Sequence, residues 1–549
     1  MAKIKEFLNK IDMSKLVNIL AIAFGAIATV YSIYFFATSC FDFSKSKLYN
    51  LYFGIILFLM IGMTAYLLRI LLTDREFKYT RVYLVLAIGW CTIAQLAMPP
   101  MTGVEEVYHY MSAYHASDII MGYEDQDLAT TEDGGTNWDE ENSYFYIRKE
   151  DINSYATVDL NFPDEFEIIA DGNWFHCSEE GQELTACHRY PATWYRYIFS
   201  GLGITIARLL KWGFMGTIFL GRFMNSLSLI LAGLFAIKLM PKGKLQVISF
   251  SLLPTVLELC NSYSYDNMSI IFSMLLFALC MYYSQDSVQL HSWDLIILCA
   301  TAAILIPNKV AYGVFVIWIL CIPLKKWWQI IKSKKWYEYT FLAAFVAAAV
   351  GVFYKVVYRY FWLTVVTVVW KSDGVGIEQD ASRESFSFHW ILYSWENVVY
   401  TIKFSLNGIK EDFWYNIKHI IGCELGYVYL NIPVHIVCTV LLIIILFLGL
   451  FVKRGKGYKK RQIIWALIGG IVCLVVIFIG CLIRFTPLNG STRVQISYRY
   501  LIPIYMSFFF LAGSDAEENK YSLALIYAQN ITLIFVICYA LNYLLSISV

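Results

Sequence analysis

The chain has 549 residues, of which 58% are hydrophobic and only 15% carry a charged side chain. Ordinary soluble domains are about 25% charged, so this composition excludes a soluble globular enzyme. A helix of about 20 apolar residues crosses a bilayer core about 30 Å thick. The sequence therefore predicts an all-α polytopic membrane protein.

Apolar runs with the composition of membrane helices follow one another along the chain. We expect thirteen of them, at 17–39, 51–73, 82–99, 217–239, 245–260, 267–283, 293–307, 310–323, 338–360, 433–452, 462–483, 500–513 and 522–547. Several runs are short for a full crossing. We expect these to be tilted, broken or extended into the neighbouring turns.

Basic clusters between the runs set the expected orientation. Lys residues gather at 3–15 and 238–244, and the strongest clusters lie at 325–335 and 453–461. If thirteen helices alternate, all four clusters fall on the same side of the membrane as the N-terminus. Because short loops rich in Lys and Arg stay in the cytoplasm, we expect the N-terminus inside and the C-terminus outside.

The net charge of +1 conceals an uneven distribution. Between residues 100 and 190 the chain has 21 acidic residues and only three basic ones. This charge density is that of a water-soluble domain. We therefore expect the segment 100–190 to be a large, folded external first loop, with a second external segment at 361–432.

Two cysteines in the acidic loop differ from the others, which lie mostly in apolar runs. Cys177 and Cys187 are ten residues apart and are flanked by His176 and His188. In an oxidising exterior a disulfide is the simpler expectation, and a zinc site is the alternative. No metal is assigned on this basis.

The chain contains no Walker or Rossmann glycine pattern. A nucleotide-driven pump is therefore disfavoured. We expect no cofactor and no nucleic-acid partner.

An acidic pair follows the third apolar run, which ends at the two prolines 99–100. The spacing from Thr102 to Glu105 is that of a capping box, so it predicts an external helix that carries Glu105, Glu106 and His109. Two carboxylates with a histidine one turn away are a reasonable general-base site for a hydroxyl nucleophile. The alternative is that Glu105 only closes the capping box.

Several basic residues fall at the external helix ends in this topology, against the inward bias of Lys and Arg. They are Arg222, Lys309, Lys355, Arg359, Arg484, Arg493 and Arg499. Such a group could hold the phosphate of a lipid-linked sugar. Ion pairs to the acidic loop or contacts to ordinary headgroups would also explain it. Asp266 is either a second carboxylate or a plain turn residue.

Four segments carry a resemblance to a known family. Residues 100–114, PMTGVEEVYHYMSAY, look like the Pro-Asp-Glu-x-x-His-x-x-x-Ala-Tyr segment of the bacterial membrane family named domain of unknown function 2142. The pair 190–191, the segment 221–225 and the segment 497–503 support it, and the last is similar to a Gln-Gly-Arg-Tyr-Phe-x-Pro motif. The resemblance covers roughly 82–513.

This sequence departs from the family pattern in two places. Glu105 stands where the family usually has Asp, and Ser497-Tyr498 replaces the Gln-Gly pair before Arg499. The first change moves the carboxylate by one methylene group. Either Glu105 or Glu106 could therefore correspond to the family's functional acid.

That family in turn resembles the C-type (GT-C) glycosyltransferases, multi-helix enzymes that take a sugar from a polyprenyl-phosphate carrier on the outer face. In them an acidic residue of the first external loop is the catalytic base. The resemblance implies a catalytic set of Glu105, Glu106 and His109. Together with the external cations, it gives an expected substrate-binding set of Arg222, Asp266, Lys309, Arg499 and Tyr500.

The expected organisation has four parts. They are an N-terminal two-helix addition at 1–81, a GT-C-like membrane core at 82–360 that includes the acidic loop, the second external segment at 361–432, and C-terminal membrane helices at 433–549.

The expected function is an inverting transfer of sugar from a polyprenyl-phosphate donor to a surface glycan, lipid or protein. The protein would act in the bacterial plasma membrane, in contact with membrane lipids, with its active face extracytoplasmic. A transporter or flippase of lipid-linked glycans is the first alternative, and it predicts ionisable residues at the bilayer midplane. A non-catalytic scaffold for envelope synthesis is the second.

Overall fold

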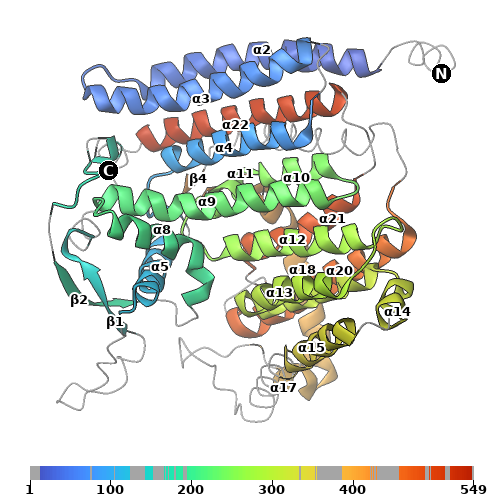
Figure 1. The fold of residues 1–549 in the computed structure, drawn as a ribbon. Helices are drawn as coiled ribbons and strands as arrows, with labels where there is room; N and C mark the ends of the chain where they lie inside the picture. Colours follow the sequence, from blue (N-terminus) through green and yellow to red (C-terminus); the bar gives the residue numbers. More distant parts are fainter. Residues whose placement is uncertain are drawn as a thin grey trace, which may run out of the picture.

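The long helices run side by side in stacked layers (Figure 1). The structure is a computed structural model, and it describes residues 13–73, 77–103, 105–123, 142–151, 166, 168–170, 172–178, 181–188, 194–332, 336–352, 354, 386, 388–420, 422, 424–425, 428–429, 457–488, 494, 496–513 and 520–546. Helices dominate this part of the chain, so the predicted all-α class is confirmed at this level.

The first and last described helices form one side of the molecule. Helices α2 (Met13–Cys40) and α3 (Lys47–Leu72) make the outer layer, and α4 (Tyr79–Ala97) and α22 (Lys520–Ser546) lie beneath them. Helix α22 packs along α2 and also contacts α3. Buried polar groups fix this layer, because Asn530 accepts a hydrogen bond from Trp90 (2.9 Å) and donates one to Thr64 (3.1 Å).

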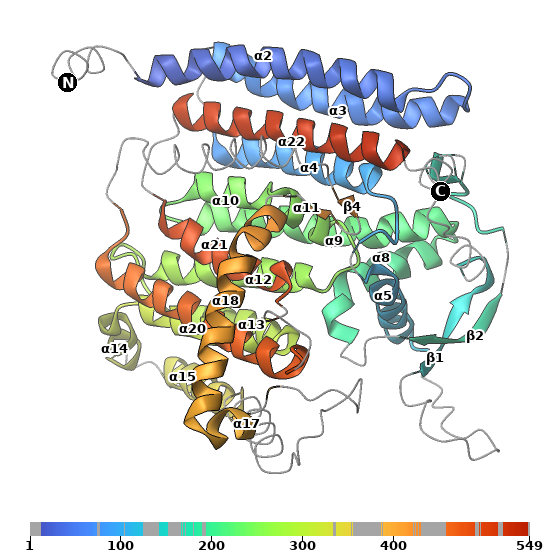
Figure 2. The ribbon, with the colours of Figure 1, turned by 180° about the vertical axis from the view of Figure 1, so that it is seen from behind.

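Further helices form the rest of the bundle (Figure 2). They are α9 (Phe214–Leu239), α10 (Lys244–Ser251), α11 (Pro254–Cys260), α12 (Asp266–Tyr283), α13 (Ser292–Asn308), the 3₁₀ helix η2 (Val310–Cys321), α15 (Trp336–Val352), α20 (Lys460–Phe485) and α21 (Ile502–Leu511). Helix α9 packs against α4 and α12, and α20 packs against η2. Helix α18 (Trp395–Ile420), preceded by α17 (Phe388–Tyr393), runs across the others (Figure 2).

The other described helices and the strands complete the fold. They are α5 (Glu106–Met121), β1 (Asn142–Arg148), β2 (Gln182–His188), the 3₁₀ helix η1 (Trp194–Tyr197), α8 (Ile198–Leu209), α14 (Leu324–Lys332), β3 (Glu424–Leu425), β4 (Val428–Tyr429) and the 3₁₀ helix η4 (Tyr498–Tyr500). Elements α5, α8, β1 and β2 lie together at one end of the bundle, and α14 lies at the other (Figure 1).

The thirteen expected membrane spans are confirmed only in part. Within the described residues, six helices are long and apolar enough to cross a membrane, and a bent pair brings the number to seven if it is one span. The six lie at 47–72, 79–97, 214–239, 266–283, 460–483 and 522–546. The predicted run 433–452 lies outside the described residues.

Two of the short runs are interrupted, as expected. The run 245–260 is divided into α10 and α11, and Pro254 begins the second helix because proline has no N–H to continue the first. The run 310–323 is wound as the 3₁₀ helix η2, and α14 turns away from it by 83°. At this bend Lys326 donates hydrogen bonds to the carbonyls of Tyr283 (2.7 Å) and Val288 (2.6 Å) at the end of α12.

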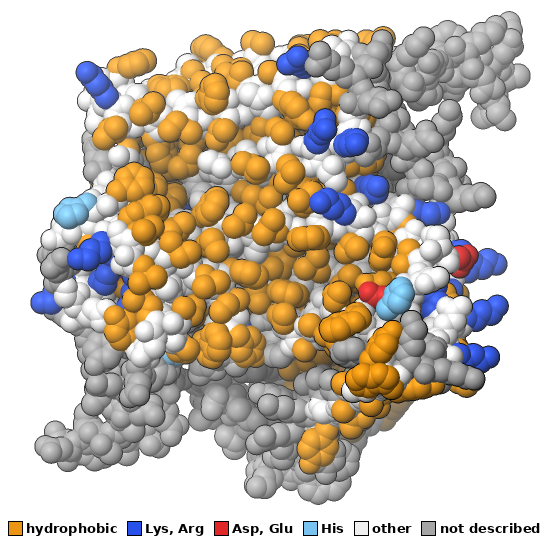
Figure 3. Space-filling model, in the orientation of Figure 1, with side chains coloured by type: hydrophobic (Ala, Val, Ile, Leu, Met, Phe, Trp, Pro, Cys, Tyr) orange, Lys and Arg blue, Asp and Glu red, His pale blue; other side chains and the backbone are white. Residues whose placement is uncertain are grey.

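The surface shows an apolar band. Hydrophobic side chains cover the middle of the face in Figure 3, and Lys and Arg gather towards the end where α14 lies. Exposed apolar side chains on the spanning helices include Ile55, Phe58, Phe223, Leu231, Phe235, Ile471 and Val475. An uncharged band between polar ends is what a lipid-facing surface requires.

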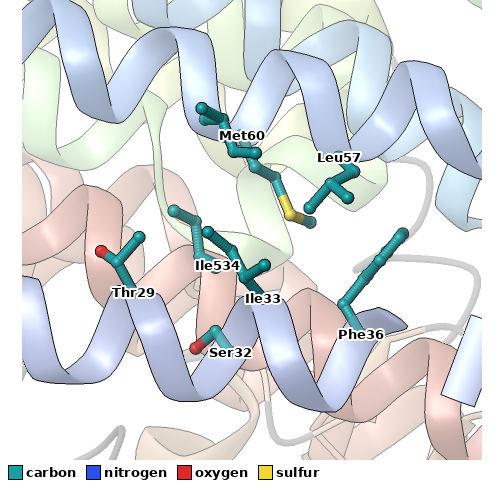
Figure 4. A pocket seen from close by; sticks show the side chains of 8 residues that line it. Thr29, Ser32, Ile33, Phe36, Leu57, Met60 and Ile534 are labelled. Atoms are coloured by element: carbon teal, nitrogen blue, oxygen red, sulfur yellow. The ribbon is translucent and has the colours of Figure 1, made fainter. Parts of the chain in front are cut away.

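A small apolar pocket lies between α2, α3 and α22 (Figure 4). Its lining includes Ser32, Phe36, Met60 and Ile534. None of the carboxylates or cations singled out from the sequence lines this pocket. It therefore offers no acid, base or charged group for chemistry.

The described part of the acidic loop is folded, as predicted. Strands β1 and β2 pair antiparallel from Asn142 with His188 to Arg148 with Gln182. The side chain of Cys187 lies outside the described residues, as does that of His188, so the disulfide and its zinc alternative stay predictions.

A buried ion pair attaches this hairpin to the bundle. Arg148 contacts both carboxylate oxygens of Asp151, at 2.7 and 2.9 Å, and donates to the Trp212 carbonyl and the Thr217 hydroxyl, each at 2.7 Å. Tyr114 of α5 donates to the same carboxylate at 2.7 Å. The hairpin, α5 and the start of α9 are thus joined through one ion pair.

Replacing Arg148 with glutamine should lower the free energy of unfolding by about 3–5 kcal/mol, because it leaves the Asp151 carboxylate buried without its cation. Thermal unfolding of the purified protein in detergent measures this. The adjacent, exposed Lys149 is the matched control, and Lys149→Gln should change stability by less than about 0.5 kcal/mol. Equal effects of the two substitutions would contradict the assignment.

Candidate functional site

Polar residues from six segments converge at the end of the bundle where α5 lies. They come from the end of α4, the start of α5, the first half of α9, the α11–α12 connection, the junction of α13 with η2, and η4. Sequence reasoning placed these segments on one side of the membrane, and the contacts below join them. The site is therefore built from helix ends rather than from one continuous motif.

The start of α5 differs from the predicted capping box. Thr102 does not cap the helix, because its hydroxyl donates to the Pro99 carbonyl at 2.6 Å. The N-cap is Glu105, in a left-handed backbone conformation with φ 56°. The reciprocal contact comes from Glu106, which accepts a hydrogen bond from the Gly103 N–H at 2.9 Å. The helix thus begins three residues later than the capping box implied.

Glu106 is a buried structural carboxylate. Its second oxygen accepts a hydrogen bond from the Tyr263 N–H at 3.2 Å and lies 3.4 Å from Arg222 Nε. Arg222 donates in addition to the carbonyls of Asn261 (2.6 Å) and Met98 (2.9 Å). The phosphate-binding role expected for Arg222 stays a prediction, since its observed contacts are to the chain itself.

Apart from Glu106 and Arg222, four residues of alternating charge contact one another in a row. Arg499 Nη2 donates to Glu105 Oε2 at 2.7 Å, and Arg499 Nε lies 3.6 Å from Asp266 Oδ2. The other oxygen of Asp266 accepts a hydrogen bond from Lys309 Nζ at 2.5 Å. The order is therefore Glu105, Arg499, Asp266, Lys309, from residues up to 394 positions apart in the chain.

Exposure separates the two glutamates. The Glu105 side chain is 39% exposed, whereas that of Arg499 is 6% exposed and that of Asp266 is 1% exposed. Glu106 is 1% exposed. Of the predicted acid pair, Glu105 is thus the one that a substrate can reach without opening the fold.

Aromatic rings surround Lys309. Its ammonium group lies 3.6 Å from the centre of the Tyr500 ring and 5.0 Å from that of Tyr265. Burial lowers the pKa of Lys309 to about 8, although the Asp266 carboxylate opposes this change. The cation is held by attraction to the ring faces as well as by its carboxylate partner.

His109 lies one turn along α5, where the sequence placed it. Its Nδ1 shares a hydrogen bond of 2.9 Å with the Tyr197 hydroxyl, and its ring meets that of Tyr265 edge to face. Burial, with a smaller contribution from Arg499, lowers the pKa of His109 to about 3. His109 is therefore neutral near pH 7, and its expected role in orienting a glutamate stays a prediction.

Several residues of the site were not predicted from the sequence. Tyr197 and Tyr265 pack around His109, and Arg196 lies over the Tyr265 ring at 5.4 Å. The WYRY sequence of η1 was the available signal, because it places an arginine among aromatic residues next to the Tyr190-Pro191 motif. Glu258 of α11 is also buried, and no described residue donates a hydrogen bond to its carboxylate.

The remaining predicted cations are less informative. Lys355, Arg359 and Arg493 lie outside the described residues, as does the side chain of Arg484. Within the part of the chain that the structure describes, no group of three or more His, Cys, Asp and Glu residues is arranged to hold a metal ion.

The arrangement has a defined chemical capacity. Glu105 offers a reachable carboxylate that can accept a proton, and Arg499 and Lys309 offer positive charge within the same series of contacts. A base next to cations suits a reaction in which a hydroxyl loses a proton while an anionic group leaves.

One comparison with known proteins identifies the family. The model described as "Predicted membrane protein (DUF2142)" matches residues 84–508. Because the match covers most of the chain, the protein belongs to this family and is a multi-pass membrane protein. The family resemblance found in the sequence is confirmed, while the likeness to C-type glycosyltransferases stays a prediction. Comparisons with curated proteins and with solved structures gave no match.

The helices that lie outside the family match are grouped together in the structure. It leaves out α2 and α3 before residue 84 and α22 after residue 508, and these three helices pack on one another. The site residues named above all lie within the matched region. The group of helices α2, α3 and α22 therefore lies outside the family match, whereas the site lies within it.

The two glutamates should respond differently to loss of charge. Glu106→Gln should lower the free energy of unfolding by about 3–5 kcal/mol, because Arg222 is then buried without a carboxylate. Glu105→Gln should cost less than about 1 kcal/mol, because Glu105 is partly exposed. Thermal unfolding in detergent compares the two, and equal destabilisation would show that Glu105 is also structural.

His109 predicts a pH dependence of stability. An unfolded histidine binds a proton below about pH 6.5, whereas folded His109 does so only near pH 3, so stability falls as the pH drops through this window. Between pH 7 and pH 5 the loss is about 2 kcal/mol at 1.36 kcal/mol per pH unit.

Melting temperatures at pH 7 and pH 5 test this prediction. His109→Gln should show a smaller loss than the wild type over this range. The exposed His291 supplies the control, and His291→Gln should keep the wild-type loss. An identical loss in wild type and His109→Gln would refute the prediction.

Proposed function

We propose that this DUF2142 family member is a membrane glycosyltransferase that moves a sugar from a polyprenyl-phosphate donor to a hydroxyl of a cell-envelope acceptor. The observation that carries the proposal is the contact of a partly exposed carboxylate, Glu105, with the buried Arg499, which continues through Asp266 to Lys309. A proton acceptor and two cations therefore lie in one connected group at a bundle end.

The proposed step divides the work between these residues. Glu105 accepts the proton of the acceptor hydroxyl as its oxygen attacks the anomeric carbon of the sugar. The bond from that carbon to the phosphate oxygen breaks, and the phosphate leaves with the electron pair. Arg499 and Lys309 stabilise the negative charge that the phosphate gains. One base and an in-line attack invert the anomeric configuration.

The proposed orientation puts this site on the extracytoplasmic face of a bacterial plasma membrane. The opposite end of the bundle holds the basic residues Lys242, Lys326, Lys459 and Arg461, where short loops rich in Lys and Arg favour the cytoplasm. The donor phosphate and the surface acceptor would then meet at the outer boundary of the bilayer.

A transporter of lipid-linked glycans is the second candidate. It would use ionisable residues near the middle of the membrane, where they line a path through the bundle. The contacts of Glu105, Asp266, Lys309 and Arg499 are instead made at helix ends. This placement favours chemistry at one surface over passage through the bilayer.

Sugar transfer by the purified protein tests the proposal. The protein in lipid nanodiscs is incubated with radiolabelled polyprenyl-phosphate sugars and an envelope extract, and labelled acceptor is measured. The wild type should transfer sugar, and Glu105→Gln should lower the rate by about 100-fold or more, the range for loss of a general base. Glu396→Gln, which neutralises an exposed carboxylate on α18, should leave the rate unchanged.

Three results would contradict the proposal. Movement of an intact lipid-linked glycan across liposomes, without transfer, would favour the transporter. Equal transfer by wild type and Glu105→Gln would remove Glu105 as the base. A surface glycan that depends on this protein in cells, but not on Glu105, would favour a scaffold.

A further inference from the structure

The partner of Arg499 is the starting point for one inference, which rests on the proposed function. We propose that the donor phosphate displaces the Glu105 carboxylate from Arg499, so that donor binding itself releases the base for the acceptor. Arg499 thus has two alternative anionic partners, Glu105 in the donor-free protein and a phosphate group in the loaded one.

The exposures of the two carboxylates decide which one leaves. Asp266 is almost completely buried and is shared between Arg499 and Lys309, so its departure would strand two cations. Glu105 is 39% exposed, and a released Glu105 carboxylate turns towards water at small cost. The ion pair with Glu105 is therefore the one that an incoming anion can replace.

The Arg499 guanidinium group has capacity for a phosphate. Its Nη1 is buried, and within the described residues no acceptor bonds to it. A buried N–H without an acceptor is unfavourable, and a phosphate oxygen supplies one. Because a guanidinium group presents its N–H groups as a planar fork, one phosphate can bond to Nη1 and to the Nη2 that Glu105 occupies.

Charge repulsion makes the two partners exclusive. A carboxylate and a phosphate on the same guanidinium group are two like charges within a few ångströms, in surroundings less polar than water. Phosphate binding therefore weakens the Glu105 contact, and the Glu105 contact weakens phosphate binding. By linkage the two effects are equal in free energy.

Release changes the chemistry of Glu105. A carboxylate that has lost its cation neighbour accepts a proton more readily. The proton of the acceptor hydroxyl then moves to Glu105, the acceptor oxygen bonds to the anomeric carbon, and the phosphate leaves with the electron pair. The inference therefore predicts that the donor binds before the acceptor becomes reactive.

Phosphate binding to Glu105→Gln tests the inference. Affinities for inorganic phosphate and for a short-chain polyprenyl phosphate are measured by calorimetry on the full-length protein in zwitterionic nanodiscs. Glu105→Gln should bind about tenfold more tightly than the wild type, because the competing charge is gone. Glu396→Gln should match the wild type. The double variant Glu105→Gln with Arg499→Lys should not show the tighter phosphate binding, because lysine keeps the positive charge but lacks the planar fork of N–H groups.

The outcomes separate this inference from the function. A gain for both compounds supports displacement by the phosphate group itself, and a gain for polyprenyl phosphate alone supports displacement by the lipid-linked phosphate. Equal or weaker binding by Glu105→Gln overturns the displacement, and the function still stands if the wild type transfers sugar. No binding of either compound, together with no sugar transfer, overturns both.

Discussion

Buried charges have to be paired, and this requirement organises the end of the bundle that carries the site. The carboxylates of Glu106 and Asp266 are almost completely removed from water, and their partners Arg222, Arg499 and Lys309 are 2%, 6% and 16% exposed. Each pair joins segments that are far apart in the sequence, so the loops between the helices are held by electrostatics as well as by packing. Breaking one pair leaves a charge in surroundings that cannot solvate it.

The same requirement explains why Glu105 stands out. It is bound to a buried cation yet remains partly exposed. The carboxylate of the neighbouring Glu106 accepts hydrogen bonds from two backbone N–H groups and pairs with Arg222. Two adjacent glutamates therefore have different environments, one structural and one reachable. This difference is the physical basis for choosing Glu105 as the base in the proposed transfer reaction.

The positions of the helices could be predicted from the sequence, because apolar runs are a local signal. The run expected at 267–283 forms α12 at 266–283, and that expected at 217–239 lies within α9. The breaks within other runs could not be placed from the sequence, and the number of thirteen spans stays a prediction. Pro254 divides the run 245–260 into two helices. The run 310–323 winds as the 3₁₀ helix η2 and bends sharply before α14.

The site could be predicted in part. Glu105 and Arg499 were reached through family motifs and helix ends, since nothing local links residues 394 positions apart. The predicted capping box does not form, because the Thr102 hydroxyl donates to the Pro99 carbonyl and Glu105 adopts a left-handed conformation. Tyr197 and Tyr265 were missed because the chain has 40 tyrosines and spacing does not distinguish these two.

Helix α12 sets the distance between the two faces of the molecule. Asp266 in its first turn contacts the site cations, and Lys326 donates to the carbonyls of its last residue, Tyr283, and of Val288 just beyond it. Both ends therefore carry the charge that the helix dipole favours. Eighteen residues at 1.5 Å each make a rod of about 27 Å, close to the thickness of a bilayer core. The helix thus separates the site cations at one end from Lys326 at the other by about the thickness of one bilayer core.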